Sequence, residues 1–510
     1  MNDWTAGYVA EIGYTFGYYS ELNPLRARLA FLDAGFAPPA TGTHCELGFG
    51  QGVSVNLHAA ASRSPWYATD FNPAQASFAK SLARASGADV HLYDEAFSDF
   101  CARSDLPDFE SIGLHGIWSW ISDGNRAVIV DFIRRKLKVG GLLYVSYNTQ
   151  PGWAATVPLR DLLTEHANVM GVPGFGLVSR IDGALAFAEK LMAANPAYAR
   201  ANPKAADTLN EIKKFDRHYL AHEYFNRDWL PMPFSRMAEW LAPAKLNYVC
   251  SARYLDHIDP LNLSAEQQAL LKDILDPMFR ETVRDFCVNQ QFRSDYWVKG
   301  AQRLTSPERV EAVRALRVIL ITARSQVSLK AKGALGEAGL AEAVYVPVLD
   351  VLGDHVPRRL GQLDHALSGK LGFGQLLQAI LVLTGKGDLA AAQDDEQIAD
   401  ALPTTQRLND TLLDKARGSS DISYLASPVT GGGVKIDRLQ QLFSLARGQG
   451  QTTPESWAQF AWQILDSQGQ RLLKDGIALA TTVENVAELV MHAKEFAEMR
   501  LPVLKALQIA

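Results

Sequence analysis

Short apolar runs alternate with longer amphipathic segments along residues 41–160. This alternation is typical of strands that are each followed by a helix, and it predicts an α/β fold with a mostly parallel sheet. We expect strands at five runs: residues 43–47, 65–70, 88–94, a run within 111–118, and 142–147. Helices are expected after Gly52, after Asn72 with Pro73 in the first turn, and over residues 125–137.

Beyond residue 148 helical patterns dominate. One more strand is expected at residues 245–252, after a helix at 234–241, and this pair would complete the sheet. Amphipathic helices are expected at residues 264–275 and 281–290, and the pattern is mostly helical from about residue 305 to the end. The expected parts are an N-terminal aromatic segment, a core, a helical insertion, a second mixed part and a helical C-terminal domain: residues 1–40, 41–160, 161–215, 216–300 and 301–510.

Length and charge narrow the class of protein. A chain of 510 residues is too long for one compact core, so two to four domains are expected. The net charge of −6 argues against a dedicated nucleic-acid binder, and the basic run at residues 134–138 is interpreted as the solvated end of a helix. The four cysteines lack metal-ligand spacing, so neither a metal site nor a disulfide framework is expected.

No signal peptide or long apolar segment is apparent. The start of the chain has no basic region followed by an apolar run, and no stretch reaches about 18 uninterrupted apolar residues. We therefore expect a cytoplasmic protein without an integral membrane segment. The sequence leaves the oligomeric state open and is compatible with a homodimer.

The run at residues 45–52 carries the most chemical information. A strand ends there in a turn with Gly48, Gly50 and Gly52, which lets the backbone lie close to a ligand. Glu46 precedes the first glycine, Asp70 closes the second strand, and Asp94 closes the third. An acid at the end of strand two suits the two hydroxyls of a ribose, and one at the end of strand three suits an adenine amino group.

A glycine loop alone leaves alternatives open. An NAD site usually shows Gly-x-Gly-x-x-Gly and lacks the third acid in this role. A turn without any ligand would leave Asp70 and Asp94 unexplained. The triple found here, Glu-x-Gly-x-Gly-x-Gly followed by the two acids, resembles the S-adenosylmethionine site of class I methyltransferases.

Further motifs resemble one group within that class. They are residues 46–52 with 69–74, His-Gly-Ile-Trp-Ser-Trp at 115–120, Ser-Tyr-Asn-Thr-Gln-Pro-Gly-Trp at 146–153, and His-Glu-Tyr at 222–224. Together they are similar to bacterial methyltransferases with a methyltransferase regulatory domain, a group that includes the rickettsial-type outer-membrane-protein lysine methyltransferases. The resemblance spans roughly residues 5–300. Phe49 departs from it, because many relatives have a small residue or Cys there.

The resemblance implies a Rossmann-like core, a largely helical regulatory domain and a helical, winged-helix-like C-terminal domain. It also implies S-adenosyl-L-methionine as cofactor, held by one set of residues: Glu46, Gly48, Gly50, Gly52, Asp70, Phe71, Asp94, Glu95 and Ala96. Tyr14, Tyr18 and Tyr19 are expected to form a lid over it, although core packing of this segment is nearly as well supported.

Four residues are candidates for the catalytic, acceptor side. Trp118 ends strand four, Tyr147 and Asn148 end strand five, and Trp153 follows them. Tyr147 and Asn148 could orient an acceptor. The aromatic rings of Trp118, Trp120, Tyr147 and Trp153 could line an amine channel, with core packing as the alternative for Trp118 and Trp120. His115 is interpreted as a core histidine. The pair at 222–223 is expected on a strand; a surface polar pair is slightly favoured, and the alternative is that one of the two residues faces the site, with Glu223 among the candidate acids near its mouth.

The expected function is methyl transfer to a protein lysine amine, which makes a protein substrate the expected partner. A small molecule or a glycan precursor is an alternative acceptor. A cofactor-binding regulatory protein without turnover is the alternative from another class. Residues 1–300 are expected to bind cofactor when expressed alone.

Overall fold

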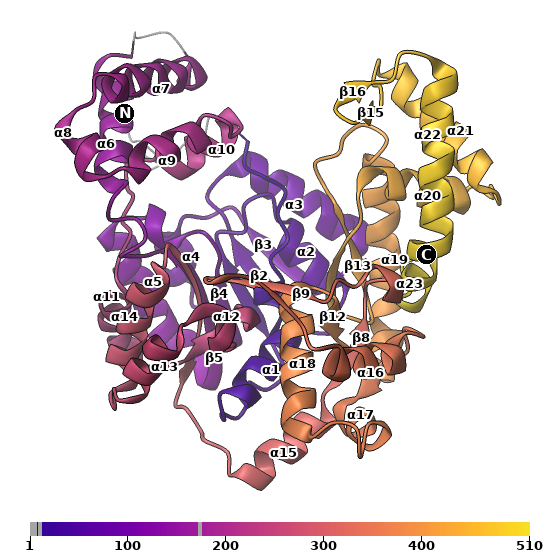
Figure 1. Cartoon of the computed structure of the whole chain (residues 1–510), viewed down its shortest axis with the longest axis horizontal. Coiled ribbons are helices and arrows are strands. Elements are labelled where there is room, and N and C mark those ends of the chain that lie inside the picture. The colour runs from indigo at the N-terminus through magenta and orange to yellow at the C-terminus, as the bar shows by residue number, and fades with distance from the viewer. Residues whose placement is uncertain (1–7, 9–12, 172–175) are drawn as a thin grey trace.

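A seven-stranded sheet lies at the centre of the chain, with helices on both faces (Figure 1). The computed structural model describes residues 8, 13–171 and 176–510. The strands run in the order β3-β2-β1-β4-β5-β7-β6, and only β7 is antiparallel to its neighbours. Their bounds are β1 (His44–Leu47), β2 (Trp66–Thr69), β3 (Val90–Tyr93), β4 (Phe109–Leu114), β5 (Leu137–Asn148), β6 (Leu246–Ser251) and β7 (Phe292–Lys299).

The expected α/β fold is thus confirmed, and the helices that follow the strands begin at strong caps. The side chain of Asn72 accepts hydrogen bonds from the backbone N–H groups of Ala74 and Gln75, and Pro73 occupies the first turn. The flanking helices are α1 (Pro24–Asp33), α2 (Val53–Ala60), α3 (Pro73–Ser86), α4 (Phe97–Ala102), α5 (Asp123–Lys136) and α11 (Phe234–Leu241). The basic run does end α5 and pairs with Asp131.

Two strands differ from their expected bounds. β4 ends at Leu114, so His115 lies beyond the strand and Trp118 and Trp120 lie on a 3₁₀ turn, η2 (Trp118–Trp120). Gly116 has a φ of +65°, which turns the chain out of the extended conformation before it reaches the tryptophans. β5 is longer than expected and pairs with β7 up to Asn148, opposite Phe292.

A helical insertion stands beside one end of the sheet (Figure 1). It comprises α6 (Val157–Val169), α7 (Leu177–Ala193), α8 (Ala197–Ala201), α9 (Lys204–Ile212) and α10 (Arg217–Tyr224). His222 and Glu223 lie on α10, so the expectation of a strand is wrong here, as is that of a surface pair, because His222 is buried. Asp216 caps this helix by accepting from His218 and Tyr219 backbone N–H groups.

Residues 246–299 return to the sheet. Between β6 and β7 the chain forms η4 (Tyr254–His257), α12 (Asp259–Asn262), α13 (Ala265–Lys272) and α14 (Pro277–Val288). The strand expected at 245–252 is β6, and it takes the outer position beyond β7. The second mixed part therefore completes the sheet rather than forming a layer of its own.

The C-terminal part packs back onto the core in two places. It has the helices α15 (Ser306–Ala315), α16 (Glu342–Leu352), α17 (Leu360–Ala366), α18 (Phe373–Lys386), α19 (Asp395–Lys415), α20 (Arg438–Gly448), α21 (Pro454–Ser467), α22 (Thr482–Glu495) and α23 (Leu501–Ala506). It also has short strands that the sequence did not predict: β8 (Arg317–Leu320), β9 (Lys330–Gly333), β10 (Gly336–Gly339), β11 (Arg358–Arg359), β12 (Leu389–Ala391), β13 (Tyr424–Ser427), β14 (Gly432–Lys435), β15 (Leu473–Lys474) and β16 (Ile477–Ala478).

Each of the two contacts with the core contains a buried apolar cluster. Val53 and Leu57 of α2 share one buried cluster with Leu408 of α19 and Trp457 of α21. In the other, α1 shares a cluster with α16 and α18. None of the helices in the described part of the chain is long and apolar enough to cross a membrane.

Candidate active site

A cavity of about 220 Å³ lies at the carboxyl ends of β1, β2 and β4. Proteins with an open α/β sheet commonly bind their ligands at this edge. The cavity is polar on the side of the glycine loop and aromatic on the side of the N-terminal segment. The lining residues are Tyr8, Tyr14, Thr15, Gly17, Tyr19, Gly48, Phe49, Gly50, Gln51, Gly52, Val53, Asp70, Phe71, Gln75, Glu95, Ala96, Phe97, Ser98, His115, Gly116, Ile117, Trp120, Ile121, Ser122, Asn125 and Asp228.

The loop after β1 requires its glycines. Gly48 and Gly52 have φ values of +78° and +69°, a region that disfavours other residues. A Cβ on Gly48 would lie 2.2 Å from Ile117 Cδ1, and one on Gly52 would lie 2.4 Å from Ala79 Cβ. The loop backbone is therefore packed tightly on both sides, and α2 begins directly after it with free N–H groups.

Asp70 ties this loop to the end of β2. Its carboxylate accepts a hydrogen bond of 2.8 Å from the Gly50 backbone N–H and one of 2.9 Å from the Asn72 N–H. Burial raises the pKa of Asp70 to about 6. Each carboxylate oxygen keeps lone pairs beyond these bonds, so the group can also accept from a ligand hydroxyl.

Glu46 lies beneath the loop and does not line the cavity. It is only 2% exposed, and its Oε2 has no hydrogen-bond partner among the described residues. Burial, reinforced by the nearby Asp70, raises the pKa of Glu46 to about 8. At neutral pH much of this carboxyl is protonated and can donate a hydrogen bond into the loop region.

Only some of the residues that the sequence assigned to the adenine line the cavity. Glu95 and Ala96 line the cavity, and the Glu95 backbone carbonyl accepts a 2.6 Å hydrogen bond from Thr69 Oγ1. Asp94 is exposed and lies outside the described lining, because the chain turns inward only after it. Phe71 lines the cavity and meets Tyr8 edge to face at 5.7 Å.

The N-terminal tyrosines cover the cavity on the opposite side. Tyr14 and Tyr19 line it, whereas Tyr18 faces the C-terminal part, where its ring lies 5.3 Å from that of Tyr424. Tyr19 stacks on His115 at 3.5 Å, and His115 Nδ1 is 2.8 Å from the Tyr144 hydroxyl. Burial lowers the pKa of His115 to about 4, so this imidazole is neutral at physiological pH.

The chain after α10 contributes to the far end of the cavity, and α10 itself lies next to this end. Trp120 and Asp228 line this end, and Trp120 Nε1 donates a 3.4 Å hydrogen bond to the Glu223 backbone carbonyl. Burial raises the pKa of Glu223 to about 7. The rings of Tyr8 and Tyr14 lie 5.6 and 5.1 Å from that of His222, which joins the N-terminal segment to α10.

The four candidates for the acceptor side lie elsewhere within the described chain. Trp118 is in the core, with Nε1 3.3 Å from Met232 Sδ. Tyr147 donates to Asp295, and the Asn148 N–H donates to Ser119 Oγ. Trp153 packs in the helical insertion. The early end of β4 places Trp118 on η2, the pairing of β5 with β7 brings Tyr147 to Asp295, and none of the four lines the cavity.

Sequence reasoning missed other residues that the cavity contains. Ile117 lies within the 115–120 motif but is not among the expected site residues. Phe97 and Asn125 lie at the starts of helices, which is the only signal that those two carry. Asp228 lies about 80 residues beyond β5 and carries none. His115, interpreted as a core residue, lines the cavity.

Comparisons with known proteins place this geometry in a family. Residues 216–299 match the family described as "Predicted methyltransferase regulatory domain". A Synechocystis protein, sll1526, is 39% identical over 99% of this chain and 100% of its own length, and RP789 of Rickettsia prowazekii is 27% identical over 56% of this chain and 51% of its own. The chain belongs to the S-adenosylmethionine-dependent methyltransferases that carry this regulatory domain.

A solved structure of PKMT2 from Rickettsia typhi in complex with AdoHcy agrees with this fold along the whole chain. It has a TM-score of 0.68 and 18% identity, and it covers 97% of this methyltransferase and 100% of that chain. The matched regulatory segment is part of this core: it supplies β6 and β7 to the sheet and Asp228 to the wall of the cavity, and its Glu223 lies close to Tyr8 and Tyr14, outside the lining.

Proposed function

We propose that this methyltransferase transfers the methyl group of S-adenosylmethionine to a lysine side-chain amine of a protein. The observation that carries the proposal is the far end of the cavity, where Asp228 of the regulatory segment lines the wall and Glu223 lies close to the aromatic rings of Tyr8 and Tyr14. An amine needs this combination, because it arrives as a cation and must attack as a neutral base.

The near end fits the cofactor. The backbone of Gly48, Gly50 and Gly52 would lie against its methionine part, and Asp70 would accept from the ribose hydroxyls. Glu95, Ala96 and Phe71 would border the adenine, with Glu46 acting through the loop. The cofactor supplies an already activated methyl group, so the protein's task is to position and desolvate the acceptor.

Glu223, close to Tyr8 and Tyr14 though outside the lining, is the proposed proton acceptor. With a pKa raised to about 7 by burial, its carboxylate is available near neutral pH and is a stronger base than an exposed one. Asp228 at the cavity wall would attract the ammonium. Tyr14 and Tyr19 would hold the alkyl chain and exclude water, and neutral His115 adds no repelling charge.

Two similarities support lysine over other acceptors. The sequence motifs resemble those of the outer-membrane-protein lysine methyltransferases, and the structural neighbour is named PKMT2. A small-molecule acceptor is the second candidate, favoured by the modest cavity and its aromatic cover.

The test uses the full chain, isotope-labelled S-adenosylmethionine, purified bacterial outer-membrane proteins and free amino acids as competing acceptors. Mass spectrometry should find increments of one to three methyl groups on protein lysines. Glu223→Gln should slow transfer by about 100-fold while cofactor affinity stays within about twofold. Glu211→Gln, an exposed carboxylate on α9, is the matched control and should transfer normally. Label in small molecules with none in protein would instead establish the second candidate.

A further inference from the structure

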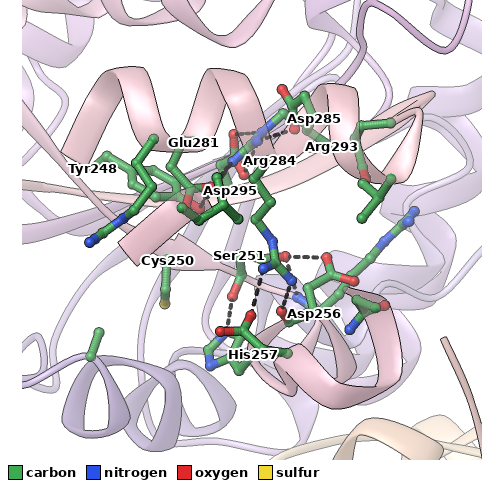
Figure 2. Close-up of a pocket in the computed structure, with 18 of the residues that line it drawn as sticks. Tyr248, Cys250, Ser251, Asp256, His257, Glu281, Arg284, Asp285, Arg293 and Asp295 are labelled. Atoms are coloured by element: carbon green, nitrogen blue, oxygen red, sulfur yellow. Dashed lines mark hydrogen bonds and ion pairs between the residues drawn. The ribbon is translucent and has the colours of Figure 1, made fainter. Parts of the chain in front are cut away.

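A second cavity, of about 900 Å³, opens on the regulatory segment (Figure 2). Its walls are β6, η4, α12, α13 and α14, its floor is β7, and β9 of the C-terminal part closes one side. None of the proposed cofactor residues lines it. It is a separate site in the described part of the chain, and nothing in the proposed transfer uses it.

The floor holds one arginine among three carboxylates. Arg293 Nη1 lies 2.6 Å from Asp285 Oδ1, Nε lies 2.9 Å from Asp295 Oδ2, and Nη2 lies 3.1 Å from Glu281 Oε2. The Tyr248 hydroxyl lies 3.0 Å from Nη2 and occupies the remaining direction. Every nitrogen of this guanidinium is therefore committed, and one positive charge faces three acids.

One oxygen of the floor is left over. Asp285 is 3% exposed and lines the cavity, yet its Oδ2 has no hydrogen-bond partner within the described residues. A buried carboxylate oxygen without a partner is costly, and native proteins rarely keep one without a use. The three carboxylates outnumber the single guanidinium, and Asp285 Oδ2 lacks a partner. A cationic group that donates a hydrogen bond would satisfy both.

The rim has the opposite character. Lys272 of α13, Arg280 of α14 and Lys332 of β9 line the cavity and are exposed. None of the three forms an ion pair with a residue that the structure describes, whereas Arg284 between them is bound to Asp259 at 2.7 Å. The cavity thus presents free cations at its mouth and unsatisfied acid at its floor.

This polarity favours a ligand that carries both charges over one that carries a single charge. A purely cationic ligand would be repelled at the rim, and a purely anionic one would be repelled at the floor. We propose that the cavity binds a small zwitterion of the α-amino-acid class, with its ammonium at Asp285 and its carboxylate at the rim cations. The inference is independent of the acceptor of methyl transfer.

The experiment titrates each of the standard amino acids into the full chain while saturating AdoHcy blocks the cofactor cavity. Calorimetry and the thermal unfolding midpoint are the readouts. At least one amino acid should bind, and its N-acetyl and carboxamide derivatives should bind at least tenfold more weakly. No binding by any amino acid would overturn the proposal, and so would equal binding of the N-acetyl derivative, which would indicate a plain anion site.

Three variants locate the site. Asp285→Asn keeps an oxygen for Arg293 but removes the charge, and Arg280→Gln changes an exposed side chain that folding does not need; each should weaken binding at least tenfold. Asp273→Asn, an exposed carboxylate at the end of α13 outside the lining, should bind like the wild type. Should Asp285→Asn fail to fold, Arg280→Gln decides alone, and unchanged binding there would overturn the proposal. AdoHcy affinity checks the fold of each variant.

Discussion

The two cavities of this methyltransferase handle buried carboxylates in opposite ways. At the cofactor cavity, Asp70 lines the wall and Glu46 lies beneath the glycine loop; neither forms an ion pair with a residue that the structure describes, and Asp70 accepts from the backbone N–H groups of Gly50 and Asn72. In the regulatory cavity, three carboxylates surround Arg293. The first arrangement leaves carboxylate lone pairs available to a ligand. In the second, most carboxylate oxygens bind Arg293, and Asp285 Oδ2 has no hydrogen-bond partner among the described residues.

The difference shows two ways in which a protein lowers the free-energy cost of burying a carboxylate. Burial raises the pKa of a carboxyl group that has no cation beside it, so that the group is partly neutral at physiological pH, as Glu46 is. An acid beside an arginine is stabilised by the pair only while both members are present. A ligand site can therefore be weakened by one substitution without loss of the fold, whereas the same change in the ion cluster should cost stability first.

The largest effect should come from Asp70→Ala. It removes two charge-strengthened acceptors for the ribose, each worth about 1.5–3 kcal/mol, and releases the Gly50 N–H. Calorimetric titration with S-adenosylmethionine should show affinity reduced by 100-fold or more, with the unfolding midpoint nearly unchanged. Asp94→Ala is the matched control, since Asp94 lies outside the cavity lining; equal losses in both variants would mean that the cavity is misassigned.

Next, Arg293→Met should destabilise the fold by about 3–5 kcal/mol, because it strands three acids in the interior. Denaturant unfolding measures this directly. The matched control is Arg280→Met. Arg280 is exposed on α14, the helix that precedes β7, so its loss should change the free energy of unfolding by less than about 0.5 kcal/mol. A stable Arg293→Met protein would erase the contrast between the two cavities.

Glu46→Gln sharpens the contrast through pH. The folded-state pKa of Glu46 is raised from 4.5 to about 8, so the stability that its proton contributes is present below pH 4.5 and lost as pH rises through about 8. The neutral amide has no such loss. Unfolding at pH 5 should show similar stabilities, and at pH 9 the variant should be more stable by on the order of 2–4 kcal/mol. A constant difference between the two pH values would contradict the burial argument.

The smallest expected effect belongs to the cover of the cofactor cavity. Tyr14→Ala should weaken S-adenosylmethionine binding by about tenfold, because Tyr14 packs over Gly50 and against His222 and excludes water from the cavity. Equilibrium binding measures the loss. Tyr219→Ala removes a tyrosine of similar size that is 40% exposed on α10, and it should bind normally. If Tyr14→Ala binds S-adenosylmethionine as tightly as the wild type, the N-terminal segment contributes only core packing.

The C-terminal part shows where local pattern is insufficient. The sequence suggests that residues 1–300 bind cofactor alone, because every cofactor motif lies there. The structure joins Val53 and Leu57 of α2 to a core formed with α19–α22, and Asn23 donates to the backbone carbonyl of Thr430. A chain ending at residue 300 would expose these apolar faces. No local pattern reports a helix face whose partner lies more than 300 residues away.

The sequence by itself determined the sheet, the glycine loop and the acid that closes β2, because strand alternation, capping residues and a turn that only glycine can make are local properties. Asp70 and Gly48 could thus be identified before any coordinates. Only the tertiary structure decided which side chains face the cavity. Trp118 and Tyr147 turn away because β4 stops at Leu114 and β5 pairs with β7, whereas Asp228 reaches the cavity wall from the chain that follows α10. Those placements depend on register and on long-range packing, which local sequence does not encode.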